Sequence, residues 1–195
     1  MLLAAGEIFF ARKDRAMAKK MFAGLIADKH DGYDARLWLG KIAVDEGDLA
    51  EAKTQLALAK KFDPDSADPY VLLAKALLKS DEDAAARELE TAAELEVMDG
   101  SIPKTLVEIY ARKRRWADVV RAARLSQFID PYDVAVHTEL ARALYALGKP
   151  ADARAEIALG LACAPTDAER AALTRLRATP GAGSKAAAPL RPSPR

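Results

Sequence analysis

The sequence predicts an all-α fold, a right-handed superhelical solenoid built from antiparallel helix pairs. Hydrophobic residues make up 51% of the chain and aromatic residues only 6%, so alanine and leucine supply most of the apolar content. Both are good helix formers. Small residues also recur inside helical segments with a period near 34 residues, and prolines repeat with the same period. Such self-similarity is typical of stacked helical repeats.

Two independent markers define the period. The separations between successive small residues are 34, 34, 33 and 34 for Gly6, Gly40, Ala74, Val107 and Ala141. Pro131 and Pro165 are also 34 residues apart, whereas Pro64 and Pro131 are 67 apart, which is two periods less one residue. Because both markers lose a residue in the same repeat, we place a single-residue deletion in the turn at residues 80–82.

The second repeat shows the pattern most clearly. Its diagnostic positions are Leu39, Gly40, Gly47, Leu49, Ala52, Leu56, Ala59 and Pro64. These residues resemble the tetratricopeptide-repeat pattern, in which a bulky residue, leucine, a small residue and an aromatic precede alanine, a second bulky residue and a terminal proline. The resemblance implies a solenoid over residues 1–178, with five repeats at approximately 1–32, 33–66, 67–99, 100–133 and 134–167 and a C-terminal capping helix at 168–178.

Each class of residue has a physical role in this pattern. The small residues let the two helices of a pair approach closely, and apolar residues at i, i+3, i+4 and i+7 fill the seam between them. Helices of about 12 to 15 residues are only marginally stable alone, so the stacking of neighbouring repeats must supply the stability. The terminal prolines end the second helix of a repeat, because proline lacks an N–H and its ring clashes with the preceding turn.

The two ends of the array differ. The first repeat begins inside its own pattern, so we expect an uncovered apolar end face that a longer chain or a second copy would cover. Asp167 is assigned as the N-cap of the last helix, which is expected to end before Pro180. Residues 179–195 contain too little hydrophobic bulk to offset the entropy of ordering, so we predict a disordered tail.

Charge and cysteine content exclude several partner classes. The formal net charge is +1, and removing the three tail cations Lys185, Arg191 and Arg195 leaves a body at −2. Such a body lacks the basic field of a nucleic-acid binder. The single cysteine, Cys163, excludes an intramolecular disulfide and fits a reducing compartment. No stretch approaches the roughly 20 apolar residues of a membrane span, so we predict a cytoplasmic protein, with a signal upstream of a fragment left open.

The sequence offers few groups for catalysis. It contains two histidines and one cysteine, and it has no nucleophile elbow, zinc-protease or P-loop motif. We therefore predict no enzymatic activity, no catalytic residue, no metal site and no cofactor. His137 occupies the bulky position between helices that Tyr70 fills in the third repeat, so it is interpreted as a packed structural residue.

The resemblance implies a binding surface on the first helices of the repeats, because tetratricopeptide arrays bind extended peptides or helices along this concave side. The candidate partner-binding residues in this register are Leu37, Lys41, Asp45, Val71, Lys75, Lys79, Lys104, Glu108, Arg112, Thr138, Arg142 and Tyr145. The cations expected to meet a carboxylate or phosphate of a bound peptide are Lys41, Lys75, Lys79, Arg112 and Arg142. Plain solvation of charged helices is the competing interpretation.

The predicted function is a non-catalytic scaffold or adaptor that binds a protein or peptide, with acidic groups in the ligand. One alternative is a helical appendage of a larger enzyme or secretion component, and another is a module that self-assembles into a homo-oligomer through the N-terminal repeat. The carboxylate clamp of chaperone-binding relatives uses paired asparagines, and this chain contains no asparagine. The Ala- and Arg-rich composition is the only ground for expecting a bacterial source.

Overall fold

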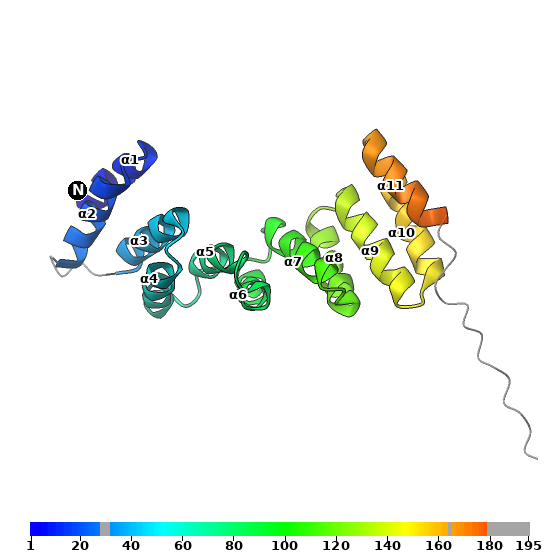
Figure 1. The fold of residues 1–195 in the computed structure, drawn as a ribbon, viewed down its shortest axis with the longest axis horizontal. Coiled ribbons are helices and arrows are strands. Elements are labelled where there is room, and N and C mark those ends of the chain that lie inside the picture. Colours follow the sequence, from blue (N-terminus) through cyan, green and yellow to red (C-terminus); the bar gives the residue numbers. More distant parts are fainter. Residues whose placement is uncertain (28–31, 164, 179–195) are drawn as a thin grey trace, which may run out of the picture. The chain divides into compact units, whose positions relative to one another are not determined.

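The structure, a computed structural model, describes residues 1–27, 32–163 and 165–178. These residues form eleven α-helices and no strand (Figure 1). In chain order the helices are α1 Leu2–Ala11, α2 Arg15–Ala27, α3 Tyr33–Glu46, α4 Leu49–Phe62, α5 Asp68–Leu77, α6 Glu82–Leu95, α7 Ser101–Arg112, α8 Trp116–Ile129, α9 Val134–Ala146, α10 Pro150–Ala162 and α11 Asp167–Ala178. The predicted all-α class, with five helix pairs followed by one further helix, is confirmed.

Two compact units divide the chain, Met1–Ile102 and Pro103–Arg195. In the first unit, α1 packs on α2, α3 on α4 and α5 on α6, and α5 also contacts α3 and α4. In the second unit, α9 packs against α8, α10 and α11. The repeat limits remain predictions from the sequence, and the predicted disordered tail at residues 179–195 lies outside the described residues.

The helices of the first two pairs meet most closely at the small residues that mark the period. A Cβ added to Gly40 on α3 would lie 2.5 Å from Cδ2 of Leu56 on α4, and one added to Gly6 on α1 would lie 2.5 Å from Cε1 of Phe22 on α2. Leu56 and Phe22 are completely buried. Only glycine therefore allows the observed spacing, and the predicted role of these small residues is confirmed.

The residue opposite each period marker changes size in the reverse sense. By the same register, Val107 in the fourth repeat faces the position of Ala123, and both side chains are buried. The equivalent positions opposite alanine in the third and fifth repeats carry the larger Leu89 and Ile157. Total volume across the seam is thereby kept nearly constant, which is the kind of exchange that protein cores tolerate best.

A left-handed residue closes four of the five turns within pairs. These residues are Lys13, Gly47, Arg114 and Gly148, with φ values of 64°, 77°, 55° and 73°. Each lies seven positions after its period marker. The next residue then donates its N–H to a carbonyl five residues earlier, as Lys149 does to Leu144 at 2.8 Å, which is the Schellman arrangement that ends a helix.

The third repeat omits this left-handed residue. Asp81 instead donates its N–H to the Leu77 carbonyl at 2.8 Å, four residues earlier, and no residue of this turn has a positive φ. Asp81 then caps α6 directly by accepting from the N–H of Ala84 at 2.9 Å. The single-residue deletion predicted at residues 80–82 is confirmed, and it removes the left-handed position that precedes the N-cap.

The last helix begins differently from the prediction. Its N-cap is Thr166 rather than Asp167, because the Thr166 hydroxyl accepts from the N–H of Glu169 at 3.4 Å. The Glu169 carboxylate accepts in return from the N–H of Thr166 at 2.8 Å and from its hydroxyl at 2.7 Å. This reciprocal capping box requires a threonine three residues before a glutamate, whereas Asp167 lies one residue too late to form it.

The two ends of the described chain are covered to different degrees. Leu173 of α11 is completely buried in a cluster with Val134, Ala141 and Ile157, so α11 covers the fifth pair. At the other end, Ile8 of α1 is 53% exposed. The expected apolar exposure of the first repeat is thus present at this side chain.

Gly40→Ala tests the close approach of α3 and α4. We expect the free energy of unfolding to fall by about 1–2 kcal/mol, because overpacking against Leu56 outweighs the better helix propensity of alanine. Gly24→Ala on α2 is the matched control, since the nearest atom to an added Cβ there is Cδ1 of Leu2 at 3.8 Å, an ordinary contact. Urea unfolding followed by circular dichroism measures both variants. Equal stability of the two would show that the seam can widen without cost.

Arg114→Gly tests the strain of the left-handed turn between α7 and α8. We expect the free energy of unfolding to rise by roughly 0.5–1 kcal/mol, because a non-glycine residue pays a steric penalty at positive φ. Gly148→Ala, at the same position of the fifth repeat, should lower it by a similar amount. Thermal and urea unfolding measure both changes. A loss of stability in Arg114→Gly would mean that the arginine side chain outweighs the backbone penalty.

Candidate binding surfaces

The predicted partner-binding residues divide between the two units. In the first unit, Leu37, Lys41 and Asp45 lie on α3, Val71 and Lys75 lie on α5, and Lys79 lies in the turn that follows α5. In the second unit, Lys104, Glu108 and Arg112 lie on α7, and Thr138, Arg142 and Tyr145 lie on α9. Within the first unit α3 and α5 are in contact, so their predicted residues belong to one surface.

An aromatic cluster supports this surface in the first unit. Trp38 stacks on Phe22 with a centroid separation of 5.6 Å, and it meets Phe10 edge-on at 5.0 Å. The Lys41 ammonium lies 4.5 Å from the Trp38 ring centroid and 5.2 Å from that of Phe10, and the Arg15 guanidinium lies 3.8 Å from Phe10. Lys41 is therefore held against the rings by cation–π attraction, which reduces its freedom to reach a ligand.

Asp45 links the cations of this surface. Its two carboxylate oxygens lie 3.1 Å from Arg15 Nη2 and 3.8 Å from Lys75 Nζ. The Lys75 side chain is 63% exposed, so its long contact with Asp45 contributes little to stability. Among the residues that the structure describes, none forms an ion pair with Lys79. Lys75 and Lys79 are thus the cations of the first unit that are most available to a ligand.

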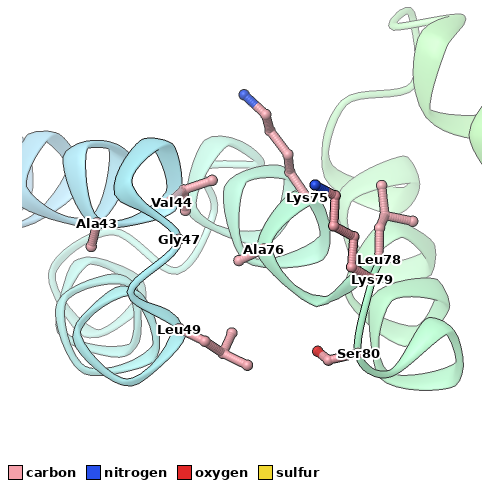
Figure 2. A pocket seen from close by; sticks show the side chains of 9 residues that line it. All are labelled: Ala43, Val44, Gly47, Leu49, Lys75, Ala76, Leu78, Lys79 and Ser80. Atoms are coloured by element: carbon pink, nitrogen blue, oxygen red, sulfur yellow. The ribbon is translucent and has the colours of Figure 1, made fainter.

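A cavity of about 470 Å³ lies beside these two lysines, between the α3–α4 turn and α5 (Figure 2). Its lining residues are Ala43, Val44, Gly47, Leu49, Lys75, Ala76, Leu78, Lys79 and Ser80. Figure 2 shows that Leu49 and Ser80 extend toward each other across the opening, while the lysine side chains rise along one side of it. The sequence prediction included only Lys75 and Lys79 from this set, because a cavity depends on which neighbouring side chains leave space unfilled.

The predicted residues of the second unit have closer intramolecular partners. Lys104 donates to Asp133 at 2.6 Å, and this hydrogen bond raises the pKa of Lys104. Asp133 is also the N-cap of α9, so Lys104 is engaged in a structural contact. Arg142 donates to both carboxylate oxygens of Glu139 at 2.8 Å, and Tyr145 packs against the C-terminal core cluster.

Arg142 also lines a second, smaller cavity. Its volume is about 310 Å³, and its lining residues are Glu108, Ala111, Arg112, Glu139 and Arg142. Charges of both signs surround this cavity, unlike the uniformly cationic side of the cavity in the first unit. The predicted residues Glu108, Arg112 and Arg142 are therefore brought together, but in a balanced charge environment.

A buried polar cluster joins three helices of the second unit. Nδ1 of His137 on α9 lies 3.0 Å from Oε2 of Glu156 on α10, and Nε2 lies 3.0 Å from the Pro131 carbonyl oxygen. Gln127 and Arg124 on α8 donate to Glu156 at 2.9 Å and 2.6 Å. His137 and Glu156 are 3% and 4% exposed. The interpretation of His137 as a packed residue is correct, and its carboxylate partner is the part that sequence reasoning missed.

The cluster shifts the ionisation of both buried groups. The hydrogen bond to Glu156 raises the pKa of His137 against the opposing effect of burial. Burial disfavours the charged form of Glu156, but hydrogen bonds from His137 and Gln127 and the charge of Arg124 outweigh it and lower the pKa of Glu156 to about 2. Protonated His137 can donate from both nitrogens to its two acceptors, so the pair is stable as an ion pair.

A comparable cluster occupies the same register in the first unit. Lys60 on α4 donates to Glu88 on α6, and its ammonium lies 4.0 Å from the ring centroid of Tyr70 on α5. Lys60, Tyr70 and Glu88 stand at the positions that Gln127, His137 and Glu156 hold in the second unit. Comparing repeats at this offset is the sequence signal that could have identified Glu156.

The described part of the chain shows no other chemical centre. In residues 1–27, 32–163 and 165–178, no group of three or more His, Cys, Asp or Glu side chains could hold a metal ion. Within the same ranges, every helix is too short or too polar to cross a membrane. The features that can recognise a ligand are therefore the cationic and apolar surfaces described above.

Comparisons with known proteins agree with this architecture. No family model matches the chain, and no curated protein matches it in sequence. Solved structures do match. The crystal structure of the MamA protein has a TM-score of 0.69, with 22% identity over 83% of this chain and 89% of that chain. A second MamA crystal structure has a TM-score of 0.68, with 21% identity over 82% of this chain and 94% of that chain.

A third match is the crystal structure of YrrB, described as a TPR protein with an unusual peptide-binding site. Its TM-score is 0.70, with 14% identity over 89% of both chains. Paired helices with a period near 34 residues and a shared turn define the chain as a helical-repeat protein. Within that class it has the tetratricopeptide-repeat fold, as its sequence pattern implies.

The His137–Glu156 pair predicts a pH-dependent stability. Because the pKa of His137 is raised, its contribution is complete below the unfolded value of about 6.5 and is lost as the pH rises through the folded pKa. The contribution of Glu156 is present above its unfolded pKa and is lost as the pH falls toward about 2. Urea unfolding across this range should therefore show an alkaline decline in the free energy of unfolding.

His137→Phe is the variant that isolates this effect. It keeps an aromatic ring at the position that Tyr70 fills in the third repeat, but it cannot titrate. We expect it to be less stable than the wild type under mildly acidic conditions and to show a flatter alkaline profile. An identical alkaline decline in both proteins would assign the effect to other groups.

Proposed function

We propose that the chain is a non-catalytic scaffold that binds a protein or peptide on the first helices of its repeats. The observation that carries this proposal is the first-unit surface, where the exposed Lys75 and Lys79 border an apolar cavity. A concave apolar site with charges of one sign at its edge has the composition expected of a site for an acidic peptide. The shared fold with YrrB, a TPR protein with a peptide-binding site, adds support.

The placement of the titratable groups also supports a role other than catalysis. Both ring nitrogens of His137 are occupied by Glu156 and by the Pro131 carbonyl, so the imidazole has no free nitrogen to offer a substrate. Cys163 lies on a different edge of the second unit, where its thiol faces the Pro131 carbonyl at 4.0 Å. A general base beside a nucleophile, which acyl-transfer chemistry requires, is not assembled from these groups.

Self-assembly is the second candidate function, favoured by the 53% exposure of Ile8 on α1. A second copy packed against α1 would bury this side chain. Light scattering that showed only monomer at high concentration would exclude it. The appendage role and the bacterial, cytoplasmic setting stay predictions from the sequence.

Charge reversal tests the binding surface. In the 195-residue chain, combined Lys75→Glu, Lys79→Glu and Arg142→Glu substitutions should reduce recovery of captured partners from cell lysate by at least about tenfold. The cause is the loss of up to three ion pairs and the repulsion that replaces them. Quantitative mass spectrometry after affinity capture measures the recovery.

The matched control reverses three exposed cations on second helices, with Lys53→Glu, Lys61→Glu and Arg154→Glu. It changes the net charge by the same amount but leaves the first helices intact. Recovery within about twofold of the wild type is expected for this control. Equal losses in both triple variants would point to a general charge effect, and unchanged capture by the first variant would contradict the proposed surface.

A further inference from the structure

We propose that the first-unit cavity holds one large apolar side chain of an acidic peptide segment, with carboxylates on that segment paired to Lys75 and Lys79. This inference rests on the proposed function, and it adds the anchoring site and the chemistry of the ligand. The cavity lies wholly within the first unit, between the α3–α4 turn and α5.

The walls of the cavity are suited to an apolar side chain. Val44 and Leu49 form the side contributed by α3 and α4, and Leu78 and Ala76 form the opposite side. Ala43 and Ala76 are too small to fill the space between the two repeats, so about 470 Å³ stays open. A volume of this size falls in the range of ligand sites, and burial of an aliphatic or aromatic side chain there would remove apolar surface of both molecules from water.

The charges at the cavity select the sign of the ligand. Lys75 and Lys79 are four residues apart and rise on the same side of the opening (Figure 2). The nearby acid, Asp45, divides its carboxylate between Arg15 and Lys75, and its contact with Lys75 is long at 3.8 Å. Two like charges with one weak counter-charge leave a cationic edge, so carboxylates beside the apolar anchor complete the electrostatic match.

The shortened turn of the third repeat shapes the remaining wall. Without a left-handed residue, the chain passes from Leu77 to the N-cap Asp81 by a tighter turn, which contains Ser80. The Ser80 hydroxyl donates to the Leu77 carbonyl at 3.3 Å, and the side chain extends toward Leu49 across the opening (Figure 2). The one-residue deletion and the cavity therefore occur at the same place in the fold.

Selection from a phage-displayed library of random linear peptides against the whole chain tests this inference. The expected products carry an aliphatic or aromatic residue flanked by Asp or Glu. A synthetic copy of the best product, labelled for fluorescence anisotropy, should bind the wild type with an affinity that falls as salt rises. Ala76→Phe fills the cavity and should weaken binding by at least about tenfold, which corresponds to the loss of one buried apolar anchor.

Three further variants separate the contributions. Lys75→Glu combined with Lys79→Glu should also weaken binding by about tenfold. Ala57→Phe on α4 adds the same bulk at an exposed position away from the cavity and should bind within about twofold of the wild type. Ala76→Leu replaces Ala76→Phe if circular dichroism shows that the phenylalanine variant is unfolded.

The outcomes distinguish the two levels of the proposal. Selected peptides without acidic residues or without an apolar anchor overturn the inference, and so does undiminished binding by a folded Ala76→Phe chain. In either case the proposed function survives, because the chain still binds a peptide elsewhere. Failure of the whole chain to select any peptide, together with unchanged lysate capture by the charge-reversed chain, overturns the proposed function itself.

Discussion

The close contact between a small residue on the first helix and a large one on the second sets the geometry of the first two pairs. At Gly40 and Leu56 the helices approach to a distance that a single added carbon would violate. This spacing commits one face of each helix to the seam, and the other faces must meet the next repeat or remain in water. The candidate binding residues are those that this constraint leaves at the surface of the first helices.

Polar clusters carry the contact between successive pairs. The second helix of one pair supplies Lys60 or Gln127, and the next pair supplies an aromatic ring and a glutamate from its two helices. Removing one partner of such a buried group is costly, whereas the intact group adds little beyond what apolar packing would provide. These clusters therefore define how one pair is placed on the next more than they add net stability. They also account for the strongest pKa shift in the described structure, that of Glu156.

A local change in backbone connects the repeat pattern to the proposed ligand. Four turns share one left-handed geometry, and the turn after α5 departs from it by a single residue. The departure places Ser80 and Lys79 at the edge of a cavity whose opposite wall comes from the preceding repeat. Array proteins can diversify in this way, because a repeat contacts only its neighbours and a change in one turn leaves the others intact.

The sequence by itself determined the helix pairs, the small-residue seam and the missing residue near position 81, because these depend on spacing along one chain and on which residue types a helix tolerates. Only the tertiary structure decided which surface cations are available. Lys41 rests on aromatic rings, Lys104 is bound by Asp133, and Lys75 and Lys79 remain beside an open cavity. Side-chain pairing between helices depends on rotamers and on neighbours some 30 residues away in the chain, as for the pair Lys104 and Asp133 with a separation of 29. A periodic pattern shows that such neighbours exist, but it does not show which atoms meet.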